Sequence, residues 1–236
     1  MKFSTMIAAI NDAGRIGDAI ASVQPCDDVV VVVDDRTTDG VAEVAKMAGA
    51  RVFTRTFDGF ASQKNFGIDK AKHDWVLILD TDERLSAKLR DELHALEPEP
   101  GVVAYRFRWR NYLGQKWLAH GGLYPDYHTR LVNRKHGRYG VREVHETLEL
   151  DGKTGQLEGD VIHLTYADTS AYYHKVLKYA RDEARWTKQR PSLGSVPKEF
   201  LVRYVKLGGW RDGVPGFVSA YLMAYYKLVM RRYIKP

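Results

Sequence analysis

Short apolar runs alternate with amphipathic segments along residues 1–100 of the chain. Four runs have the composition of buried strands, and they cover residues 3–10, 29–33, 51–54 and 75–79. The other segments carry apolar residues at helical spacing, and helices are expected after Asp12, after the capping oxygens of residues 37–39, over residues 60–72 and after Ser86. This β-α-β-α-β-α-β order predicts an α/β fold with a doubly wound, mostly parallel sheet.

The pattern changes after residue 100. Strand-like pieces at residues 102–109 and 157–164 are separated by loops rich in glycine, histidine and aromatic residues. Helical spacing returns from residue 170, with a linker expected at residues 191–197 and a last helix at residues 214–234. We therefore expect an α/β catalytic domain over residues 1–169 and a helical C-terminal extension over residues 170–236.

Composition and cysteine content fit a globular protein of the cytoplasm. The chain has 236 residues, enough to bury a core, and its one cysteine, Cys26, excludes an internal disulfide and fits a reducing compartment. The first apolar run is too short for a signal peptide and is interrupted by Asn11 and Asp12. No run of about 18 apolar residues predicts a membrane-spanning helix.

Charge is distributed unevenly between the two predicted parts. Residues 170–236 hold 14 Lys and Arg against 4 Asp and Glu, a net charge of +10, whereas residues 1–169 have a net charge of −4. A polyanionic neighbour therefore suits the tail, and its aromatic residues favour the anionic inner face of the cytoplasmic membrane. The helical stripe in question contains Phe217, Tyr221, Ala224, Tyr225 and Leu228 and ends in Arg231, Arg232 and Lys235. Packing within the protein would produce the same stripe, so both interpretations stay open.

Two acidic clusters follow buried strands directly. They consist of Asp34 and Asp35 after residues 29–33, and of Asp80, Asp82 and Glu83 after residues 75–79. Ligands of open α/β sheets bind at the carboxyl ends of strands, although Asp34 alone is equally compatible with a turn. The second cluster needs a cation or a hydrogen-bond network to offset its repulsion. Asp80 and Asp82 therefore predict a site for Mg²⁺ or Mn²⁺, which would share substrate phosphates as ligands.

Phosphate-binding glycine loops are missing from the sequence. Neither G-x-G-x-x-G nor G-x-x-x-x-G-K-[ST] occurs, which argues against a nicotinamide enzyme and a P-loop kinase. A diphosphate in this protein would therefore be neutralised by the metal rather than by backbone amides alone.

Three segments, in order, resemble motifs of the family-2 glycosyltransferases. Residues 34–40, D-D-R-T-T-D-G, resemble V-D-D-x-S-T-D-G; residues 59–67 resemble G-x-x-x-A-R-N-x-G; and residues 80–83 resemble the D-x-D metal motif. Further counterparts in the small lipopolysaccharide-core glucosyltransferase type are residues 121–126, 130–131 and 144–146.

The resemblance implies a GT-A fold and inverting transfer of a hexose from a nucleotide-sugar donor, with a UDP-sugar favoured. It places Asp34 and Asp35 at the uracil or ribose, Asp80 and Asp82 at the metal and the ribose–diphosphate, and Lys64 in the donor pocket. The implied acceptor is a glycan or lipid-linked glycan such as lipopolysaccharide core.

Inverting transfer needs a general base that takes the proton of the acceptor hydroxyl. Glu146 stands where many relatives have Glu-Asp, and Asp126 follows a Gly-Gly pair. Glu146 is also compatible with a solvated strand residue, and Asp126 with a turn after Pro125. His120 and His128 are weak candidates for the acceptor site, and His163 is expected to be a hydrogen-bonded core histidine.

Two other classes of protein were weighed against the glycosyltransferase. Haloacid-dehalogenase phosphohydrolases also carry D-x-D after an apolar strand, but their motif normally continues with Thr or Val where this chain has Glu83-Arg84. A basic nucleic-acid-binding protein would use the tail, which has no recognisable nucleic-acid motif, and the acidic clusters would repel phosphate. We therefore expect no nucleic-acid partner.

Overall fold

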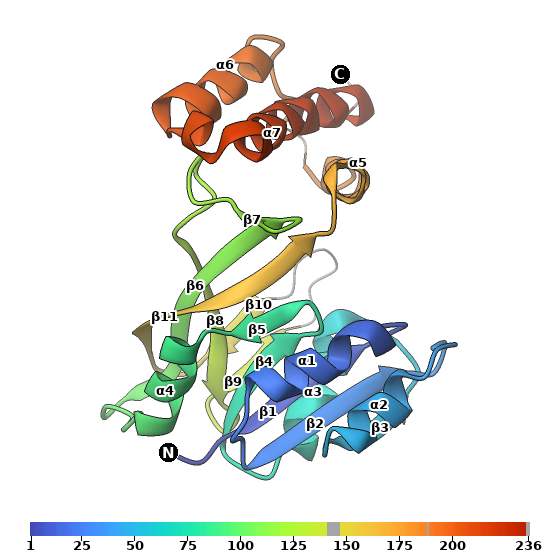
Figure 1. The fold of residues 1–236 in the computed structure, drawn as a ribbon, viewed down its shortest axis with the longest axis vertical. Coiled ribbons are helices and arrows are strands. Elements are labelled where there is room, and N and C mark those ends of the chain that lie inside the picture. The colour runs from blue at the N-terminus through green and yellow to red at the C-terminus, as the bar shows by residue number, and fades with distance from the viewer. Residues whose placement is uncertain (141–146, 188, 235–236) are drawn as a thin grey trace. The chain divides into compact units, whose positions relative to one another are not determined.

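The structure is a computed structural model that describes residues 1–140, 147–187 and 189–234. It divides the chain into two compact units, each built from two stretches of sequence (Figure 1). Unit 1 comprises Met1–Arg108 and Tyr127–Ile162, and unit 2 comprises Trp109–Asp126 and His163–Pro236. This division differs from the single boundary expected after residue 169, because residues 109–126 belong with the C-terminal helices.

Helices and strands alternate through the first part of unit 1 as the apolar pattern predicts. The parallel strands and their helices are β1 Ser4–Ala9, α1 Ala13–Ser22, β2 Asp28–Asp34, α2 Val41–Met47, β3 Arg51–Arg55, α3 Phe60–Lys70 and β4 Trp75–Asp80. The short strand β5 Glu83–Leu85, which was not predicted, and α4 Ala87–Ala95 follow. The later strands are β6 Val102–Leu113, β7 Lys116–Trp117, β8 Asp126–Asn133, β9 Gly137–Gly140, β10 Thr147–Leu150 and β11 Lys153–Tyr166.

The main sheet has the order β3-β2-β1-β4-β8-β6-β11-β5, with β7 paired to β6. Strands β3, β2, β1 and β4 are parallel, and β8 runs antiparallel to β4. The predicted doubly wound α/β fold is therefore confirmed. The chain reverses its direction of winding between β1 and β4, and ligands of such sheets bind at the carboxyl ends of the strands beside that switch.

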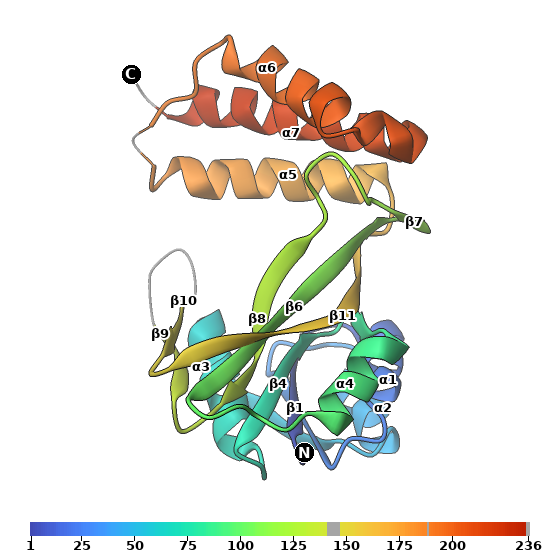
Figure 2. The same cartoon turned by 90° about the vertical axis from the view of Figure 1, so that its left-hand side faces the viewer.

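Helices cover both faces of the parallel strands. Every residue of β2 is buried, as expected for a strand without a solvent face. Helix α1 packs against α2, whereas α3 packs against β1 and β2 on the other side of the sheet (Figure 2). Right-handed crossovers produce this arrangement, because the winding direction changes before β4.

One predicted helix cap was wrong. Asp12 occupies the N-cap position of α1, but its side chain makes no capping bond, and Oδ2 accepts a hydrogen bond from Thr81 instead. Asp39 provides the cap, because its Oδ2 accepts from the amide of Ala13 at 2.8 Å while its Oδ1 accepts from that of Val41 at 3.1 Å. A single carboxylate thus joins the first turns of α1 and α2, a tertiary contact that sequence spacing does not reveal.

Unit 2 is mainly helical. Its helices are α5 Thr169–Ala184, α6 Ser195–Leu201, the π-helical segment η1 Val202–Lys206, the 3-10 turn η2 Gly209–Asp212 and α7 Gly213–Tyr233. The linker predicted at residues 191–197 was wrong in its second half, because α6 begins at Ser195. Pro197 lies in the first turn of α6, where its missing amide removes no helical hydrogen bond.

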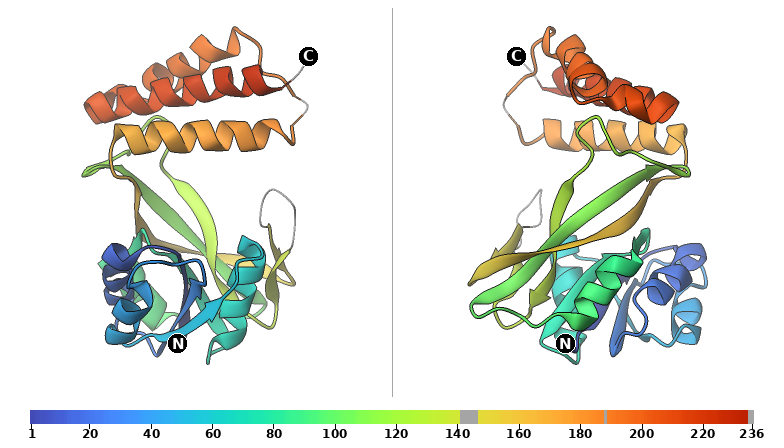
Figure 3. Two further views of the ribbon diagram at one scale, coloured as in Figure 1. Left: turned by 90° about the vertical axis from the view of Figure 1, so that its right-hand side faces the viewer. Right: turned by 60° about the vertical axis from the view of Figure 1, so that its left-hand side comes forward.

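Helix α7 packs along α5 and against α6 (Figure 3). Its buried residues Leu222, Val229 and Met230 join two apolar clusters that also contain residues of α5. The stripe expected to be apolar and contiguous is divided, because Phe217 and Tyr221 remain 46% and 55% exposed. Packing within unit 2 is therefore one role of α7, and of the predicted stripe it uses Ala224 and Tyr225. Among the residues described, no helix is both long and apolar enough to cross a bilayer.

Close packing of α3 on the sheet yields the first prediction. A Cβ at Gly67 would overlap the Met6 side chain and lie 3.1 Å from Cγ2 of Val32, so Gly67→Ala should destabilise the protein by about 1–3 kcal/mol. The control is Gly14→Ala in α1, which has no atom within 4 Å and should stabilise the protein by about 0.5–1 kcal/mol. Urea unfolding measures both changes, and stabilisation by both substitutions would contradict the packing described.

Candidate functional site

Three loops meet beside the switch point, after β1, β2 and β4. Asn11 follows β1 in a left-handed conformation, with φ of 52°, and its Oδ1 accepts a hydrogen bond from the amide of Thr38 at 2.8 Å. Asp12 accepts from the hydroxyl of Thr81 at 2.9 Å. These two bonds fasten the loops after β2 and β4 to the loop after β1, so the acidic clusters are held on one connected surface.

Asp34 and Asp35 have different environments at the end of β2. Asp34 is buried, and its carboxylate accepts from the amide and Nε of Arg36, each at 2.9 Å, and from Nη2 at 2.5 Å. The Arg36 guanidinium holds the pKa of Asp34 at about 2, so the carboxylate is ionised at neutral pH. Asp35 is exposed and accepts from the hydroxyl of Thr56. Asp34 thus makes the contacts of a turn residue, which was one of its two possible roles. Asp35 is the more accessible of the two carboxylates.

A buried ion pair supports the carboxyl end of β4. Strand β8 pairs with β4 so that Leu131 lies opposite Leu77, and the preceding residue, Arg130, reaches the end of β4. Its Nη2 lies 3.1 Å from Oδ2 of Asp80 and 3.5 Å from Oε1 of Glu83. Glu83 is 1% exposed, and its Oε2 also accepts from the amide of Asp80 at 2.9 Å. Glu83 therefore acts inside the protein.

Positive charge keeps Asp80 ionised despite its surroundings. Burial raises the pKa of Asp80, but the Arg130 guanidinium and the Lys64 ammonium outweigh that effect, so the pKa lies below its usual value. Lys64 comes from α3, and its Nζ lies 5.1 Å from the centre of the Tyr139 ring in β9. The Lys64 ammonium is thus close enough to Asp80 to lower its pKa.

Sequence reasoning missed the residues that brace this acidic turn. Arg84 donates through Nη1 to the carbonyls of Thr81 and Glu83, each at 2.7 Å, and through Nη2 to the carbonyl of Arg15 at 2.8 Å. Glu83 was grouped with Asp80 and Asp82 in the acidic cluster, Arg84 served only to compare motifs, and Arg130 was noted only as part of a resembling segment. Glu83 and Arg84 directly follow the D-x-D motif, and Arg130 lies in the strand that pairs with β4. Those positions could have identified them from the sequence.

The acidic residues that remain suit a hard divalent cation. The Asp80 side chain is 38% exposed, and within the described ranges its ion pair to Arg130 is made through Oδ2. The described residues contain no cluster of three or more His, Cys, Asp and Glu able to hold a metal. A cation at Asp80 and Asp82 would therefore complete its coordination with water and phosphate oxygens, as Mg²⁺ commonly does.

Of the two candidate bases, the structure describes only Asp126. Glu146 lies outside the described residues, and Asp126 belongs to unit 2. Oδ2 of Asp126 accepts from Nδ2 of Asn111 at 3.2 Å, and Oδ1 of Asn111 lies 2.8 Å from Nδ1 of His163 and 3.0 Å from the Thr165 hydroxyl. His163 is hydrogen-bonded as expected, and this network orients the Asp126 carboxylate.

His120 has a structural environment within unit 2. Its Nδ1 lies 2.7 Å from Oδ1 of Asp212, and its amide donates to Oδ2 of the same carboxylate at 2.8 Å. Asp212 is 4% exposed. The pair fastens the loop after β7 to η2, so these contacts favour a structural role over the weakly expected acceptor site.

Comparison with known proteins identifies the class. Residues 4–148 match Glycosyl transferase family 2, and the chain belongs to this family. It is therefore a glycosyltransferase with a GT-A fold, as the motifs implied, and the phosphohydrolase and nucleic-acid-binding alternatives are set aside.

Its relatives include the lipopolysaccharide core biosynthesis glycosyltransferase LpsC of Rhizobium meliloti, 29% identical over 96% of this chain and 89% of that protein. A glycosyltransferase of Rickettsia prowazekii is 42% identical over 97% of this chain and 85% of the relative. A crystal structure of S. aureus TarS, residues 1–349, in complex with UDP-GlcNAc has a TM-score of 0.48 and 12% identity, covering 99% of this chain and 90% of that 1–349 chain.

The ion pair of Arg130 provides the second prediction. Arg130→Met should lower the free energy of unfolding by about 3–5 kcal/mol, because it leaves the buried Glu83 carboxylate without its cation. The control is Arg138→Met, which removes an ion pair to Asp69 whose side chains are 48% and 55% exposed and should lose less than about 1 kcal/mol. Equal losses in chemical denaturation would show that Arg130 is not needed to compensate Glu83.

Proposed function

We propose that this glycosyltransferase moves a hexose from a UDP-sugar, with inversion at the anomeric carbon, to a glycan or lipid-linked acceptor such as lipopolysaccharide core. The observation that carries the proposal is the placement of Asp35 and Asp80 at the ends of β2 and β4, on either side of β1. A nucleotide lying across the switch point would meet both carboxylates.

The described residues fit the parts of such a donor. Asp35 is exposed and offers acceptor oxygens to the ribose or uracil, while Asp80 and Asp82 lie where the diphosphate would be held with Mg²⁺ or Mn²⁺. When bound, the cation would supply Lewis-acid stabilisation of the leaving diphosphate. Lys64 and Arg130 add positive charge beside Asp80 and would help to orient the donor.

The acceptor hydroxyl must lose a proton as its oxygen bonds to the anomeric carbon and UDP departs. Glu146 and Asp126 remain the two candidates for the base. Asp126 is supported by its hydrogen bond from Nδ2 of Asn111, which orients the carboxylate. Glu146 is supported by its place in the V-H-E segment of residues 144–146.

Similarity to LpsC supports a lipopolysaccharide-core acceptor. A lipid-linked acceptor would make a peripheral position on the inner face of the cytoplasmic membrane useful, and the net charge of +10 on residues 170–236 suits an anionic lipid surface.

Donor binding tests the proposal through Asp82. UDP-sugars should raise the thermal melting temperature of the protein more strongly with Mn²⁺ or Mg²⁺ than without, because ligand binding to the folded state stabilises it. Asp82→Ala should abolish both the metal-dependent part of this shift and sugar transfer. The control is Asp91→Ala, whose side chain is 77% exposed in α4 and which should behave like the wild type. A full metal-dependent shift in Asp82→Ala would reject the proposed metal role.

Single-residue kinetics separate the two candidate bases. Glu146→Gln should leave the donor-dependent thermal shift intact and lower kcat by roughly 10²- to 10⁴-fold, because the acceptor proton loses its base. Asp126→Asn should have a much smaller effect if Glu146 is the base. The reverse result would assign the base to Asp126, and intact turnover in both variants would exclude both residues.

A further inference from the structure

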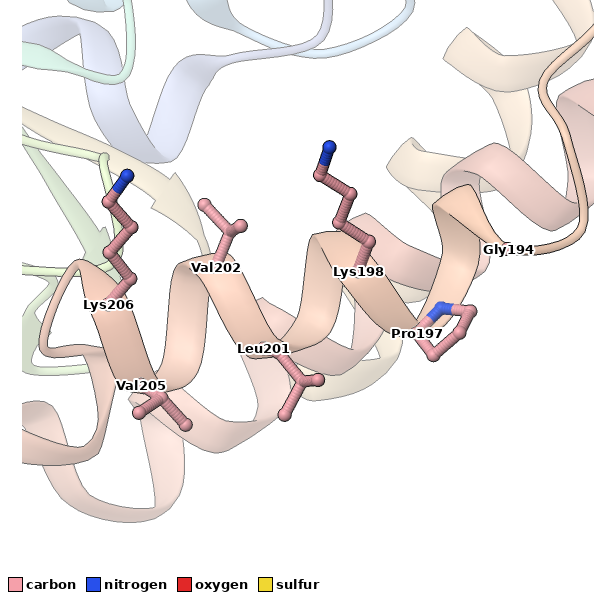
Figure 4. Close-up of a pocket in the computed structure, with 7 residues that line it drawn as sticks. All are labelled: Gly194, Pro197, Lys198, Leu201, Val202, Val205 and Lys206. Carbon is pink, nitrogen blue, oxygen red and sulfur yellow. The ribbon is translucent and has the colours of Figure 1, made fainter.

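An apolar strip lies exposed along α6 and η1. It is lined by Pro197, Lys198, Leu201, Val202, Val205 and Lys206, and we call it the α6 face (Figure 4). Leu201 and Val205 are 57% and 58% exposed, and the strip borders an open groove of about 590 Å³. Figure 4 shows both lysines leaving the helix on one side and Leu201 and Val205 on the other. The face therefore combines apolar and cationic edges.

Packing on α7 uses other residues of the same helical segment. The ring of Phe217 in α7 lies 5.6 Å from each of the rings of Phe200 and Tyr204. These aromatic contacts attach the segment to α7 without burying Leu201 or Val205. Exposed apolar side chains of this kind are typical of a surface that meets a partner.

The exposed charged side chains around the α6 face are positive, because the acidic residues nearby are paired within the protein. Residues 189–234 contain two acidic residues, Glu199 and Asp212. Glu199 lies 2.6 Å from Nε of Arg203 and 2.6 Å from Nζ of Lys227, and its pKa is lowered by these two cations against the opposing effect of burial. Asp212 is buried against His120, as described above. The exposed charges of this segment are therefore cationic, including Lys198 and Lys206.

Exposed apolar residues also flank the α6 face along the chain. Leu193 precedes it and is 62% exposed, while Leu207 and Trp210 follow η1 and are 43% and 59% exposed. Trp is enriched at membrane–water interfaces, where its ring meets both apolar and polar groups. A polar macromolecule bound here would offer these apolar side chains no apolar surface to pack against.

We propose that the α6 face docks on an anionic lipid bilayer. Leu201 and Val205 would enter the boundary between headgroups and acyl chains, and Lys198 and Lys206 would pair with lipid phosphates. This proposal rests on the proposed function for its purpose, which is to hold the enzyme beside a lipid-linked acceptor.

The basic cluster that the sequence suggested for this role, Arg231, Arg232 and Lys235, stays a prediction beside the α6 face, and Arg232 is exposed. Nη1 of Arg231 donates to the carbonyl of Pro191 at 2.8 Å, so this residue ties α7 to the loop before α6. Lys235 lies outside the described residues. A second copy of the chain is a less suitable occupant, because two such faces would bring like charges together, and lysine is depleted in protein interfaces.

Cosedimentation of the full chain with vesicles tests the docking. Binding should be strong to phosphatidylcholine mixed with phosphatidylglycerol, weak to phosphatidylcholine alone, and reduced as salt rises. Lys198→Gln with Lys206→Gln should weaken binding by about 10- to 30-fold. Leu201→Glu with Val205→Glu should weaken it by at least about tenfold, since insertion would then carry two charges into the boundary.

Matched changes in unit 1 provide the controls. Lys2→Gln with Lys46→Gln removes two exposed lysines, and Met47→Glu places a charge on a side chain that is 80% exposed. Both controls should bind vesicles like the wild type, and thermal melting checks that every variant is folded. If the controls lose as much binding as the α6 variants, the site is not the α6 face.

Three outcomes would overturn the proposal. They are equal binding of the wild type to neutral and anionic vesicles, unchanged binding by the lysine variant, and a concentration-dependent dimer in analytical ultracentrifugation that the Leu201 and Val205 changes dissolve. The thermal shift with UDP-sugar and Mn²⁺ is measured without vesicles. Loss of docking with an intact shift therefore rejects only the α6 face, and the opposite result rejects only the proposed function.

Discussion

Charge compensation at the carboxyl end of β4 is the constraint on which the rest of the site depends. Three carboxylates within four residues are not stable together in a partly buried turn without positive charge nearby. Antiparallel pairing of β8 with β4 places Arg130 at this turn, where it neutralises Glu83 and contacts one oxygen of Asp80. The turn can therefore stay folded while it presents negative charge at the surface, where a cation and a diphosphate would bind.

The same division between internal and presented carboxylates occurs at the end of β2. Asp34 is held by Arg36, and Asp39 caps two helices, whereas Asp35 faces solvent. The acidic residues of this motif thus have different roles: Asp34 and Asp39 stabilise the loops, and Asp35 remains accessible. This division explains how a family-2 glycosyltransferase can concentrate aspartates beside its switch point without losing stability.

In unit 2, the side chains that pack between helices and the side chains that face solvent lie on different sides of the same helices. The buried side of α7 joins α5 through Leu222, Val229 and Met230. Aromatic rings attach the α6 segment to α7, and both acidic residues of the segment are paired internally. What remains outward is apolar and cationic, the combination expected for contact with an anionic lipid surface.

The sequence by itself determined the alternation of the four parallel strands with their helices, the family and the position of the acidic clusters, because period, strand-end chemistry and motif spacing are local properties. Tertiary structure alone decided which carboxylates are internal, since Arg130 reaches Glu83 through the pairing of strands about fifty residues apart. It likewise decided that Asp39 rather than Asp12 caps α1, and that Leu201 and Val205 of the α6 segment lie exposed beside two lysines. Each of these outcomes depends on contacts between segments distant in the chain, which the periodicity of one segment does not record.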